Sequence, residues 1–263
     1  MKETPDGMVR TAVPMGSASE VLDDLDAHRD ALVSLPPQGR LAWALEHFPG
    51  QFALTTSFGI QSAVLLHMLS ELPSGRETPV VWVDTGYLPP ETYLYAATLT
   101  ERLGIRLVVA QSEMSPARME ALHGKLWETD DVSDLELYHR IRKVDPLEAA
   151  FEALRTQCWA SGVRRKQTDH RRSMTWLDPI RDRLGLHPLL DWTNKDVYYY
   201  MTSHDLPQHP LFEQGYSTVG DWHSSRPDDG DLSGRETRFG GLKQECGIHL
   251  GDAVGEGMMG DGI

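Results

Sequence analysis

Residues 51–72, QFALTTSFGIQSAVLLHMLSEL, decide the fold that we predict for this chain. The stretch opens with an apolar, threonine-containing run over 51–58, which is typical of a buried strand. Gly59 then allows the backbone to turn tightly, and 60–72 has the spacing of a helix. A strand followed at once by a helix is the first half of a β-α-β unit.

The same alternation continues after this stretch. Residues 79–83 (PVVWV) are a short buried-strand candidate, 90–103 has helical spacing with Pro90 suited to the first turn, and 105–110 is a third strand candidate. Alternating strands and helices predict an α/β fold with a doubly wound, mostly parallel sheet flanked by helices. Such sheets bind ligands in the crevice at the carboxyl ends of their strands.

The pattern extends on both sides of this region. We expect helices over 18–35, from about 38 to 48 and over 146–154, and a further strand over 156–163. Near residue 193 the sequence TNKD has a threonine and, three residues on, an aspartate, which is the signature of a helix N-terminus.

The two ends of the chain differ from the middle in composition. Residues 1–17 are rich in Pro, Gly and Met without periodicity, and 221–236 are rich in Asp, Ser and Gly with little apolar content. We therefore predict a flexible lead over 1–17, one α/β domain over 18–220, and a mobile loop with a C-terminal tail over 221–263. His223, in that loop, is interpreted as a solvated side chain.

Composition limits the classes of function. The chain has 263 residues, a formal net charge of −14 and 40% hydrophobic residues, which is enough for a core. Such a charge argues against general binding to nucleic acid or to an anionic membrane surface. No apolar run approaches the ~20 residues of a membrane span, and the N-terminus lacks an apolar signal core, so we expect a cytoplasmic protein.

The two cysteines, Cys158 and Cys246, stand in different surroundings. Two cysteines without a C-x-x-C pair form neither a disulfide framework nor a local zinc or cluster site. Cys158 lies in an apolar run beside Trp159, which favours a buried structural cysteine. Cys246 follows basic residues and precedes His249, and nearby cations lower the pKa of a thiol and so favour its reactive thiolate. A free surface cysteine on a tail is the alternative.

Three motifs have residue types that bind anions or nucleosides. SFGIQS (57–62) lies where a strand meets a helix, so free N–H groups, the helix dipole and two serine hydroxyls can attract a phosphate or sulfate. VDTGY (83–87) ends the next strand, where Asp84 can accept a hydrogen bond from a ribose or base amine. GVRRKQTDHRR (162–172) gathers basic residues in an acidic chain, and the planar fork of Arg suits phosphate and sulfate. Taken singly, the motifs also fit an ordinary turn, a helix cap and a solvated basic helix face.

Together these stretches resemble the phosphoadenylyl-sulfate (PAPS) reductase family of the adenosine-nucleotide α-hydrolase-like superfamily. SFGIQSAVLLH is similar to its modified phosphate loop and VDTGYLPPETY to its Leu-Asp-Thr-Gly…Glu-Thr-Tyr segment, with Val83 in place of Leu. GVRRKQ is similar to its arginine loop, and KQECGIHL (243–250) to its catalytic tail. The resemblance covers about residues 40–250 and implies reduction of PAPS to sulfite and adenosine 3′,5′-bisphosphate in sulfate assimilation.

The resemblance implies a role for each matched residue. Cys246 would attack the sulfonyl sulfur and form an S-sulfonate, from which reduced thioredoxin or glutaredoxin releases sulfite. A flexible catalytic tail would let Cys246 meet first the substrate and then this partner. A homodimer is also implied. The implied substrate-binding residues are Ser57, Phe58, Gly59, Gln61, Ser62, Asp84, Thr85, Lys143, Arg164, Arg165, Arg235, Arg238 and His249.

The family has two branches, which differ in an iron–sulfur cluster. One branch reduces adenylyl sulfate (APS) and holds a four-iron cluster on a Cys-Cys pair and a Cys-x-x-Cys pair. Those positions fall here on Tyr138 and His139 and on Asp221 and Ser224. The resemblance therefore implies an enzyme without a bound cluster or metal that takes PAPS as its substrate.

Other functions stay open from the sequence. A cluster-free APS reductase would carry the same motifs. A nucleotide transferase or ATP pyrophosphatase of the superfamily usually has Ser-Gly-Gly-x-Asp-Ser, from which Phe58 and Gln61 depart. A non-catalytic nucleotide-binding redox sensor would keep the loops and would not need Cys246 for sulfite production.

Overall fold

A single sheet forms the centre of the fold in the computed structural model, which describes residues 18–129, 131–228 and 247–249. The six strands of this part of the chain lie in the order β3-β2-β1-β4-β6-β5. Neighbours are parallel except β5 and β6, which pair antiparallel. The strands are β1 (Phe52–Thr56), β2 (Pro79–Val83), β3 (Arg106–Ala110), β4 (Cys158–Ala160), β5 (Leu177–Ile180) and β6 (Arg183–Leu186).

The strand order reverses beside β1. The chain runs from β1 through β2 to β3 at one edge, and then crosses to β4 on the other side of β1. The two connections that leave β1 and β4 therefore diverge, which opens a crevice at the carboxyl ends of these strands. The sequence prediction of a doubly wound, mostly parallel sheet is confirmed, and the topology places the ligand crevice between β1 and β4.

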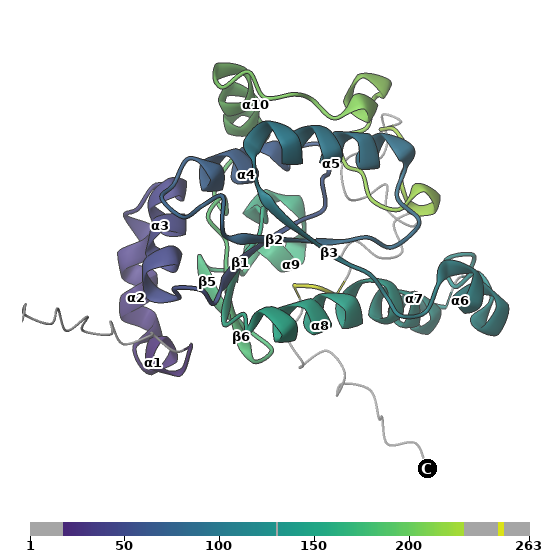
Figure 1. Ribbon diagram of the computed structural model, residues 1–263, viewed down its shortest axis with the longest axis horizontal. Helices are drawn as coiled ribbons and strands as arrows, with labels where there is room; N and C mark the ends of the chain where they lie inside the picture. The colour runs from purple at the N-terminus through teal and green to yellow at the C-terminus, as the bar shows by residue number, and fades with distance from the viewer. Residues whose placement is uncertain (1–17, 130, 229–246, 250–263) are drawn as a thin grey trace, which may run out of the picture.

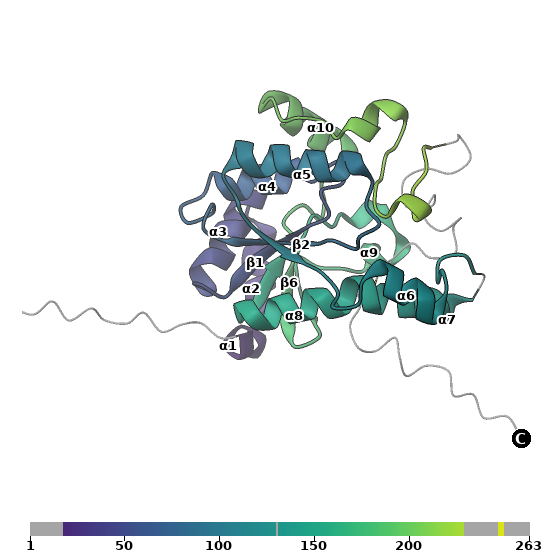
Figure 2. The same cartoon turned by 45° about the vertical axis from the view of Figure 1, so that its right-hand side comes forward.

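Helices cover both faces of the sheet. Figure 1 shows α4 and α5 over one face and α8 over the other. Figures 1 and 2 both show α6 and α7 side by side beyond α8. The helices are α1 (Ala18–Asp23), α2 (Leu25–Val33), α3 (Pro37–His47), α4 (Ala63–Ser70), α5 (Pro90–Leu103), α6 (Pro116–His123), α7 (Val132–His139), α8 (Asp145–Leu154), α9 (Asp169–Arg172) and α10 (Asn194–Ser203). No helix in the described part has the length and apolarity needed to cross a membrane.

The described chain also contains one short π-helical turn and three short 3₁₀-helical turns. A π-helical turn, Arg140–Val144, joins α7 to α8. Turns of 3₁₀ helix span Arg165–Gln167, Pro210–Gln214 and Trp222–Ser224. Such π-helical turns are rare and occur often at functional sites, which makes residues 140–144 candidates for part of the site.

The core explains why the central strands read as continuous apolar runs. Successive side chains of a strand point to opposite faces. In β1, Phe52 and Leu54 pack in the cluster that includes α4 and α5, whereas Ala53 packs with Phe151 of α8. Because both faces are covered, Phe52, Ala53 and Leu54 are all buried, and the strand becomes half-buried only at Thr55 and Thr56. Cys158 begins β4 fully buried, as the sequence predicted.

Most predicted elements are present, with changed ends. β2 and α5 have the predicted bounds, and the threonine of TNKD caps α10 by accepting a hydrogen bond from the backbone N–H of Asp196. The helix predicted over 18–35 is wrong as one element, since Asp24, at φ −132° and ψ 41°, separates α1 from α2. The strand predicted over 156–163 is reduced to β4. The lead over 1–17 lies outside the described residues.

His209 is a buried histidine that holds a turn. Its Nδ1 accepts a hydrogen bond from the N–H of Leu211 (3.1 Å), which leaves the ring proton on Nε2, 3.1 Å from Oγ1 of Thr92. Burial lowers the pKa of His209 to about 4. The unfolded chain, with a histidine pKa near 6.5, therefore binds more protons between pH 6.5 and 4. The free energy of unfolding must fall as the pH drops through this window.

His209→Asn tests this linkage, because asparagine keeps an acceptor at the cap and cannot be protonated. We expect wild type to lose up to about 1.4 kcal/mol per pH unit more than the variant between pH 6 and 4.5. Urea denaturation at a series of pH values measures the difference. His187, whose pKa is also about 4, stays in both proteins and gives the slope that remains. Equal slopes in the two proteins would contradict the assignment.

Candidate active site

A cavity of about 860 Å³ opens at the carboxyl ends of β1, β2 and β4, where the strand order reverses. Thr55 and Thr56 at the end of β1, Val83 at the end of β2 and Ser161 directly after β4 all line it. The volume suits a small-molecule ligand such as a nucleotide. The cavity therefore lies in the crevice where the topology predicts a ligand.

The predicted substrate-binding residues divide into three groups. Phe58, Asp84 and Arg165 are described but are not among the residues that line the cavity. Arg235, Arg238 and the predicted nucleophile Cys246 lie outside the described residues. The cavity is lined by the following predicted residues: Ser57, Gly59, Gln61, Ser62, Thr85, Lys143, Arg164 and His249.

Phe58 anchors the turn between β1 and α4. Its φ is +46°, a left-handed conformation that is uncommon for a residue with a side chain, and its ring is fully buried. The ring packs edge-on against Trp82, with centroids 5.1 Å apart, and its N–H donates to Oγ1 of Thr56 (3.1 Å). Packing of the ring thus holds a strained backbone that turns its neighbours, Ser57 and Gly59, to the cavity.

The start of α4 borders the same cavity. Ser62 precedes the helix and donates from its Oγ to the carbonyl of Gly59 (2.8 Å). Gly59 lies where two segments of the chain approach each other, since a Cβ at this position would lie 3.4 Å from the carbonyl oxygen of Val219. The positive end of the α4 dipole is therefore next to the ligand space, which favours an anionic group.

The arginine loop supplies two deeply buried cations. Arg164 is 6% exposed and donates from Nη1 to the amide oxygen of Asn194 (2.8 Å) and from Nη2 to that of Gln61. Burial, and then repulsion from Arg171, lowers the pKa of Arg164 to about 10, so it stays charged at neutral pH. Arg171 is 2% exposed and donates to the amide oxygen of Gln167. Neutral amide partners hold the guanidinium group of Arg164 in place and leave its charge available to an anion.

Four further basic side chains, which are not among the predicted substrate-binding residues, also line the cavity: Lys166, Arg171, Arg172 and Lys195. Of the described residues, the basic ones that line the cavity are Lys143, Arg164, Lys166, Arg171, Arg172 and Lys195. The sequence signal for most of them was the basic cluster at 162–172. Lys195 is in the first turn of α10, far along the chain, and only the fold brings it to the cavity.

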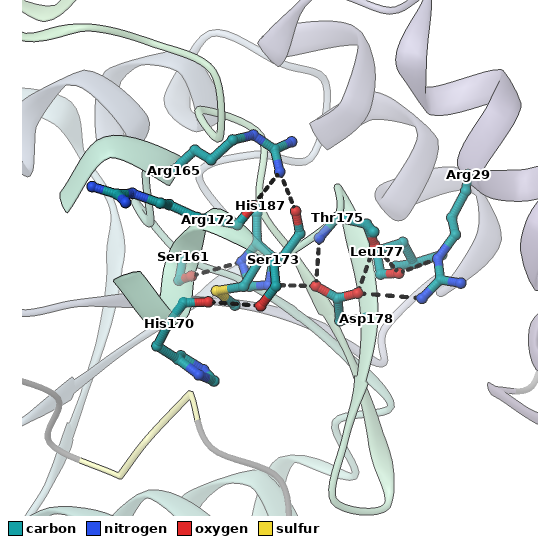
Figure 3. A network of polar contacts seen from close by, with 11 residues as sticks. Arg29, Ser161, Arg165, His170, Arg172, Ser173, Thr175, Leu177, Asp178 and His187 are labelled. Carbon is teal, nitrogen blue, oxygen red and sulfur yellow. Dashed lines mark hydrogen bonds and ion pairs between the residues drawn. The ribbon is translucent and has the colours of Figure 1, made fainter. Parts of the chain in front are cut away.

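Arg165 and Asp84 have structural partners instead. Nε of Arg165 donates to Oδ1 of Asp191 (2.9 Å). Its Nη1 donates to the carbonyl of Met174 and to the carbonyl of Arg172, and Figure 3 shows Arg165 beside Arg172. The carboxylate of Asp84 accepts from the N–H of Gly86, the hydroxyl of Tyr93 and the amide of Gln111, at 2.9, 2.6 and 2.7 Å. Both side chains therefore hold the loops that line the cavity.

A buried ion pair joins the π-helical turn to the segment near residue 221. Nζ of Lys143 lies 2.6 Å from Oδ2 of Asp221, and the hydroxyl of Thr85 donates to Oδ1 of Asp221 (2.5 Å). Burial by itself raises the pKa of Asp221, but Lys143 and the nearby His223 outweigh burial, so its pKa lies well below the ordinary value. The carboxyl group of Asp221 is therefore ionised at neutral pH, at the edge of the cavity that Lys143 and Asp221 both line.

The four positions compared with cluster cysteines gather around this ion pair. Asp221 lies close enough to Tyr138 to raise its pKa, although burial raises that pKa more. His139 contacts Tyr138, and the N–H of Ser224 donates to the carbonyl of Asp221 (3.0 Å). A four-iron cluster needs thiolates, whereas these side chains are a phenol, an imidazole, a carboxylate and a hydroxyl. They do not fit a cluster, and within the described residues no group of His, Cys, Asp and Glu could hold a metal ion.

His223 is packed rather than solvated, so that interpretation of the sequence is wrong. Its ring stacks on Trp127, with centroids 4.2 Å apart and planes at 10°, and its Nε2 lies 3.0 Å from the hydroxyl of Tyr138. Tyr87 completes the aromatic group. These contacts fix the segment that carries Asp221.

The end of the predicted catalytic tail lies against the sheet. Ile248 packs in the cluster beneath α8, and the ring of His249 stacks on Trp159, with centroids 5.3 Å apart and planes at 20°. Nη2 of Arg181 donates to the carbonyl of Ile248 (2.8 Å). Ile248 and His249 both line the cavity. Ile248 and His249, two and three residues after Cys246 in the chain, are therefore part of the cavity wall. The described segment 247–249 is yellow in Figure 1.

Comparison with known proteins agrees with this site. A family model described as phosphoadenosine phosphosulfate reductase domain matches residues 51–227. A relative from Synechococcus sp., named phosphoadenosine 5′-phosphosulfate reductase, is 56% identical over 213 residues, which cover 80% of this chain and 90% of that protein. A relative of the same name from Xanthomonas campestris pv. campestris is 46% identical over 240 residues, with 91% and 98% covered.

The fold of this chain is similar to that of solved structures, one of which is a PAPS reductase. The crystal structure of a PAPS reductase from Candida auris, a phosphate complex, is 27% identical with a TM-score of 0.65, and covers 78% of this chain and 97% of that one. An FMN adenylyltransferase from Candida glabrata, 14% identical with a TM-score of 0.53, covers 92% of this chain and 81% of its own and shares the fold alone. By its family model, its relatives and its cavity, this chain belongs to the phosphoadenosine phosphosulfate reductase family.

Proposed function

We propose that this protein reduces PAPS to sulfite and adenosine 3′,5′-bisphosphate, with Cys246 as the nucleophile. One observation carries the proposal. In a chain of net charge −14, six lysine and arginine side chains of the described part converge on one nucleotide-sized cavity. Its wall also includes Ile248 and His249, which stand two and three residues after Cys246 in the sequence. The names of the relatives supply the reaction.

The cavity offers different surroundings to the parts of the substrate. The apolar side chains of Leu54, Leu65 and Val81 suit an adenine ring, and the basic residues suit phosphate and sulfonate oxygens. The buried guanidinium group of Arg164, whose side-chain partners are neutral amides, gains a counterion when an anionic ligand binds. A basic cavity in an acidic protein also concentrates the electrostatic attraction on this site.

The proposed chemistry has two displacement steps. The Cys246 thiolate attacks the sulfonyl sulfur, a new S–S bond forms, and the S–O bond to the phosphate breaks with its electron pair leaving on adenosine 3′,5′-bisphosphate. A thiolate of reduced thioredoxin or glutaredoxin then attacks the sulfur of Cys246 and expels sulfite. The second thiol of that partner resolves the mixed disulfide and frees Cys246, so a dithiol is oxidised and the sulfonyl group gains two electrons.

The cationic side chains would assist both the binding and the first step. Negative charge grows on the leaving phosphate as the S–O bond breaks, and fixed cations such as Lys143 and Arg164 stabilise it. His249 is near Cys246 in the chain and lines the cavity, where its imidazole can donate to a sulfonate oxygen. Arg235 and Arg238 are proposed to add to this set with the tail. Phe58, Asp84 and Arg165 are proposed to act by holding loops.

We also propose that the enzyme is free of an iron–sulfur cluster and that it prefers PAPS to APS. Support comes from the side chains at the cluster positions. At one of them, the carboxylate of Asp221 forms an ion pair with Lys143 and accepts a hydrogen bond from Thr85. A cytoplasmic location, and a domain over 18–220 followed by a catalytic tail over 221–263, remain predictions from the sequence. A homodimer remains a prediction from the resemblance.

The function is tested by supplying purified protein with reduced thioredoxin and either PAPS or APS, and measuring the sulfite released. We expect sulfite from PAPS at a rate well above that from APS. A preference for APS would keep the mechanism and overturn the proposed substrate. Bound nucleotide without sulfite from either compound would contradict the enzyme and favour the redox sensor.

Arg181 is expected to control how well the tail is held. Arg181 and Arg183 both pair with Glu148, but only the hydrogen bond from Arg181 reaches Ile248. Arg181→Ala should slow formation of the Cys246 S-sulfonate in a single turnover roughly tenfold, because it removes a charge-assisted hydrogen bond from the tail. Quenched mass spectrometry measures that rate.

Arg183→Ala is the matched control, since it leaves the bond to the tail and keeps Glu148 paired with Arg181. This variant should form the S-sulfonate at the wild-type rate. Equal slowing in the two variants would show that the cluster around Glu148 acts only through stability.

A further inference from the structure

A fully buried histidine, His187, lies behind the cavity wall and is not among the residues that line the cavity. Ser161 follows β4, lines the cavity and is 4% exposed. Its Oγ lies 3.2 Å from Nδ1 of His187, which is fully buried at the end of β6. Gly162, the next residue, borders open space, because a Cβ there would meet no atom within 4 Å. Ser161 is therefore the point at which a buried polar group reaches the ligand space.

A carboxylate faces the other nitrogen of this ring. Nε2 of His187 lies 3.8 Å from Oδ2 of Asp178 and has no hydrogen-bond partner among the described residues. Asp178 is fixed in turn, because it accepts from the N–H and hydroxyl of Thr175 at 2.9 and 2.6 Å and from Nη2 of Arg29 at 3.2 Å. Figure 3 shows Asp178 between Thr175 and Arg29, with His187 on its other side toward Ser161.

This arrangement selects one form of the imidazole. Burial lowers the pKa of His187 to about 4 against the opposing effect of Asp178, with a smaller contribution from Arg171 in the same direction as burial, so the ring is neutral at pH 7. A neutral imidazole carries its proton on one nitrogen only. A proton on Nε2 points toward the carboxylate of Asp178, whereas a lone pair there would face it and be repelled. The favoured tautomer therefore has its acceptor at Nδ1.

The tautomer decides what Ser161 offers to a ligand. With a lone pair at Nδ1 of His187, the hydroxyl of Ser161 donates its proton to the ring. The remaining lone pairs of Oγ are then available to the cavity, and the group can only accept. Phosphate and sulfonate oxygens are also acceptors, so they cannot form a hydrogen bond with this oxygen. An N–H or O–H group of the nucleoside can donate a hydrogen bond to it.

We propose that His187, oriented by Asp178, is a positioning residue that fixes the Ser161 hydroxyl as a hydrogen-bond acceptor for a donor group of the adenosine. The donor is the exocyclic amine or a ribose hydroxyl, and both share this chemistry. The inference rests on the proposed function, since it assigns part of the substrate selectivity of the same cavity. Ser161 touches the nucleoside and not the reacting sulfur, so its loss changes binding rather than chemistry.

The experiment measures binding of three nucleotides by calorimetry: adenosine 3′,5′-bisphosphate, its inosine analogue, which lacks the amine, and its 2′-deoxy analogue, which lacks a ribose hydroxyl. Ser161→Ala should weaken binding of the adenosine compound roughly five- to tenfold and leave unchanged the affinity for the analogue that lacks the contacted donor. The analogue that is insensitive identifies the donor. Equal weakening for all three nucleotides would overturn the proposal.

Two variants of His187 separate its role from packing. His187→Asn keeps an acceptor near Nδ1 and should bind all three nucleotides like wild type, whereas His187→Leu removes the acceptor and should behave like Ser161→Ala. In turnover, Ser161→Ala and His187→Leu should raise KM for PAPS with kcat unchanged, which is the signature of lost uniform binding. A lowered kcat with unchanged KM would contradict the assignment.

Nitrogen NMR of the His187 ring tests the tautomer directly. We expect a proton on Nε2 in wild type, and a mixture of tautomers in Asp178→Asn, whose amide no longer repels a lone pair at Nε2. A proton on Nδ1 in wild type would overturn the proposal. Wild-type protein that binds none of the nucleotides would instead refute the proposed function, so the two failures are distinguishable.

Discussion

Replacing Cys246 with serine is expected to abolish release of sulfite from PAPS and to leave the affinity for adenosine 3′,5′-bisphosphate nearly unchanged. A serine hydroxyl is a far weaker nucleophile at neutral pH than a thiolate, and a serine O-sulfonate would not yield sulfite to an attacking thiol. The basic side chains that line the cavity stay in place in this variant. Sulfite assays and calorimetry measure the two effects separately.

The mass of the protein gives a second readout for this variant. Wild-type protein mixed with PAPS, without a thiol partner, should gain the mass of one SO₃ group on Cys246, and Cys246→Ser should gain none. Sulfite production by the variant would exclude Cys246 as the nucleophile. Loss of nucleotide binding in the variant would point to a structural role for the tail.

Cys158 provides the matched control. It is fully buried, and burial raises the pKa of its thiol, so little thiolate forms. Cys158→Ala should therefore keep both sulfite release and S-sulfonate formation, although it leaves a small cavity in the core. If this variant failed to form the S-sulfonate while it remained folded, the assignment of the reactive thiol to Cys246 would be wrong.

Removing the carboxylate of Asp221 is expected to cause the largest loss of stability. Asp221→Leu leaves Lys143, 9% exposed, without the oxygen that lies 2.6 Å from its Nζ. An uncompensated buried charge of this kind costs about 3–5 kcal/mol. The free energy of unfolding from urea denaturation at pH 7 measures the loss. It should be smaller below about pH 4, where the unfolded carboxyl becomes protonated and the contribution of the depressed Asp221 pKa declines.

The double variant Lys143→Met, Asp221→Leu separates stability from function. Replacing both members of a buried ion pair with apolar side chains of similar size is often neutral, so most of the lost stability should return. The double variant should bind PAPS more weakly than wild type, because it lacks the Lys143 cation at the cavity. A double variant as unstable as Asp221→Leu would show that Asp221 acts through Thr85 or the segment around residue 221 and not through Lys143.

Local sequence determined much of this fold. Strand β2 and helix α5 have their predicted bounds, because a short apolar run bounded by polar residues and a helix opened by proline and closed by Gly104 carry their own signals. The cap of α10 is another local feature, since the two side chains that make it are three residues apart. The four ordered motifs likewise indicated the family without a structure.

Which of the motif residues reach the ligand was decided by tertiary structure. Within one loop, Arg164 lines the cavity and Arg165, its neighbour, pairs with Asp191. The backbone changes here from the extended conformation of Arg164 to the 3₁₀ turn that begins at Arg165, so the two side chains leave the chain in different directions. Asp84 had the right chemistry for a ribose, but three donors from other segments occupy it.

Long-range contacts also created features that no local pattern contains. The ion pair of Lys143 with Asp221 joins groups 78 positions apart, and Ser161 meets His187 only because β4 and β6 are neighbours in the sheet. The sequence alone determined the fold class, the basic character of the site and the candidate nucleophile, since these depend on residue type and local order. The tertiary structure alone decided which charges are buried, paired or open to a ligand, since burial and pairing depend on segments that meet only after folding.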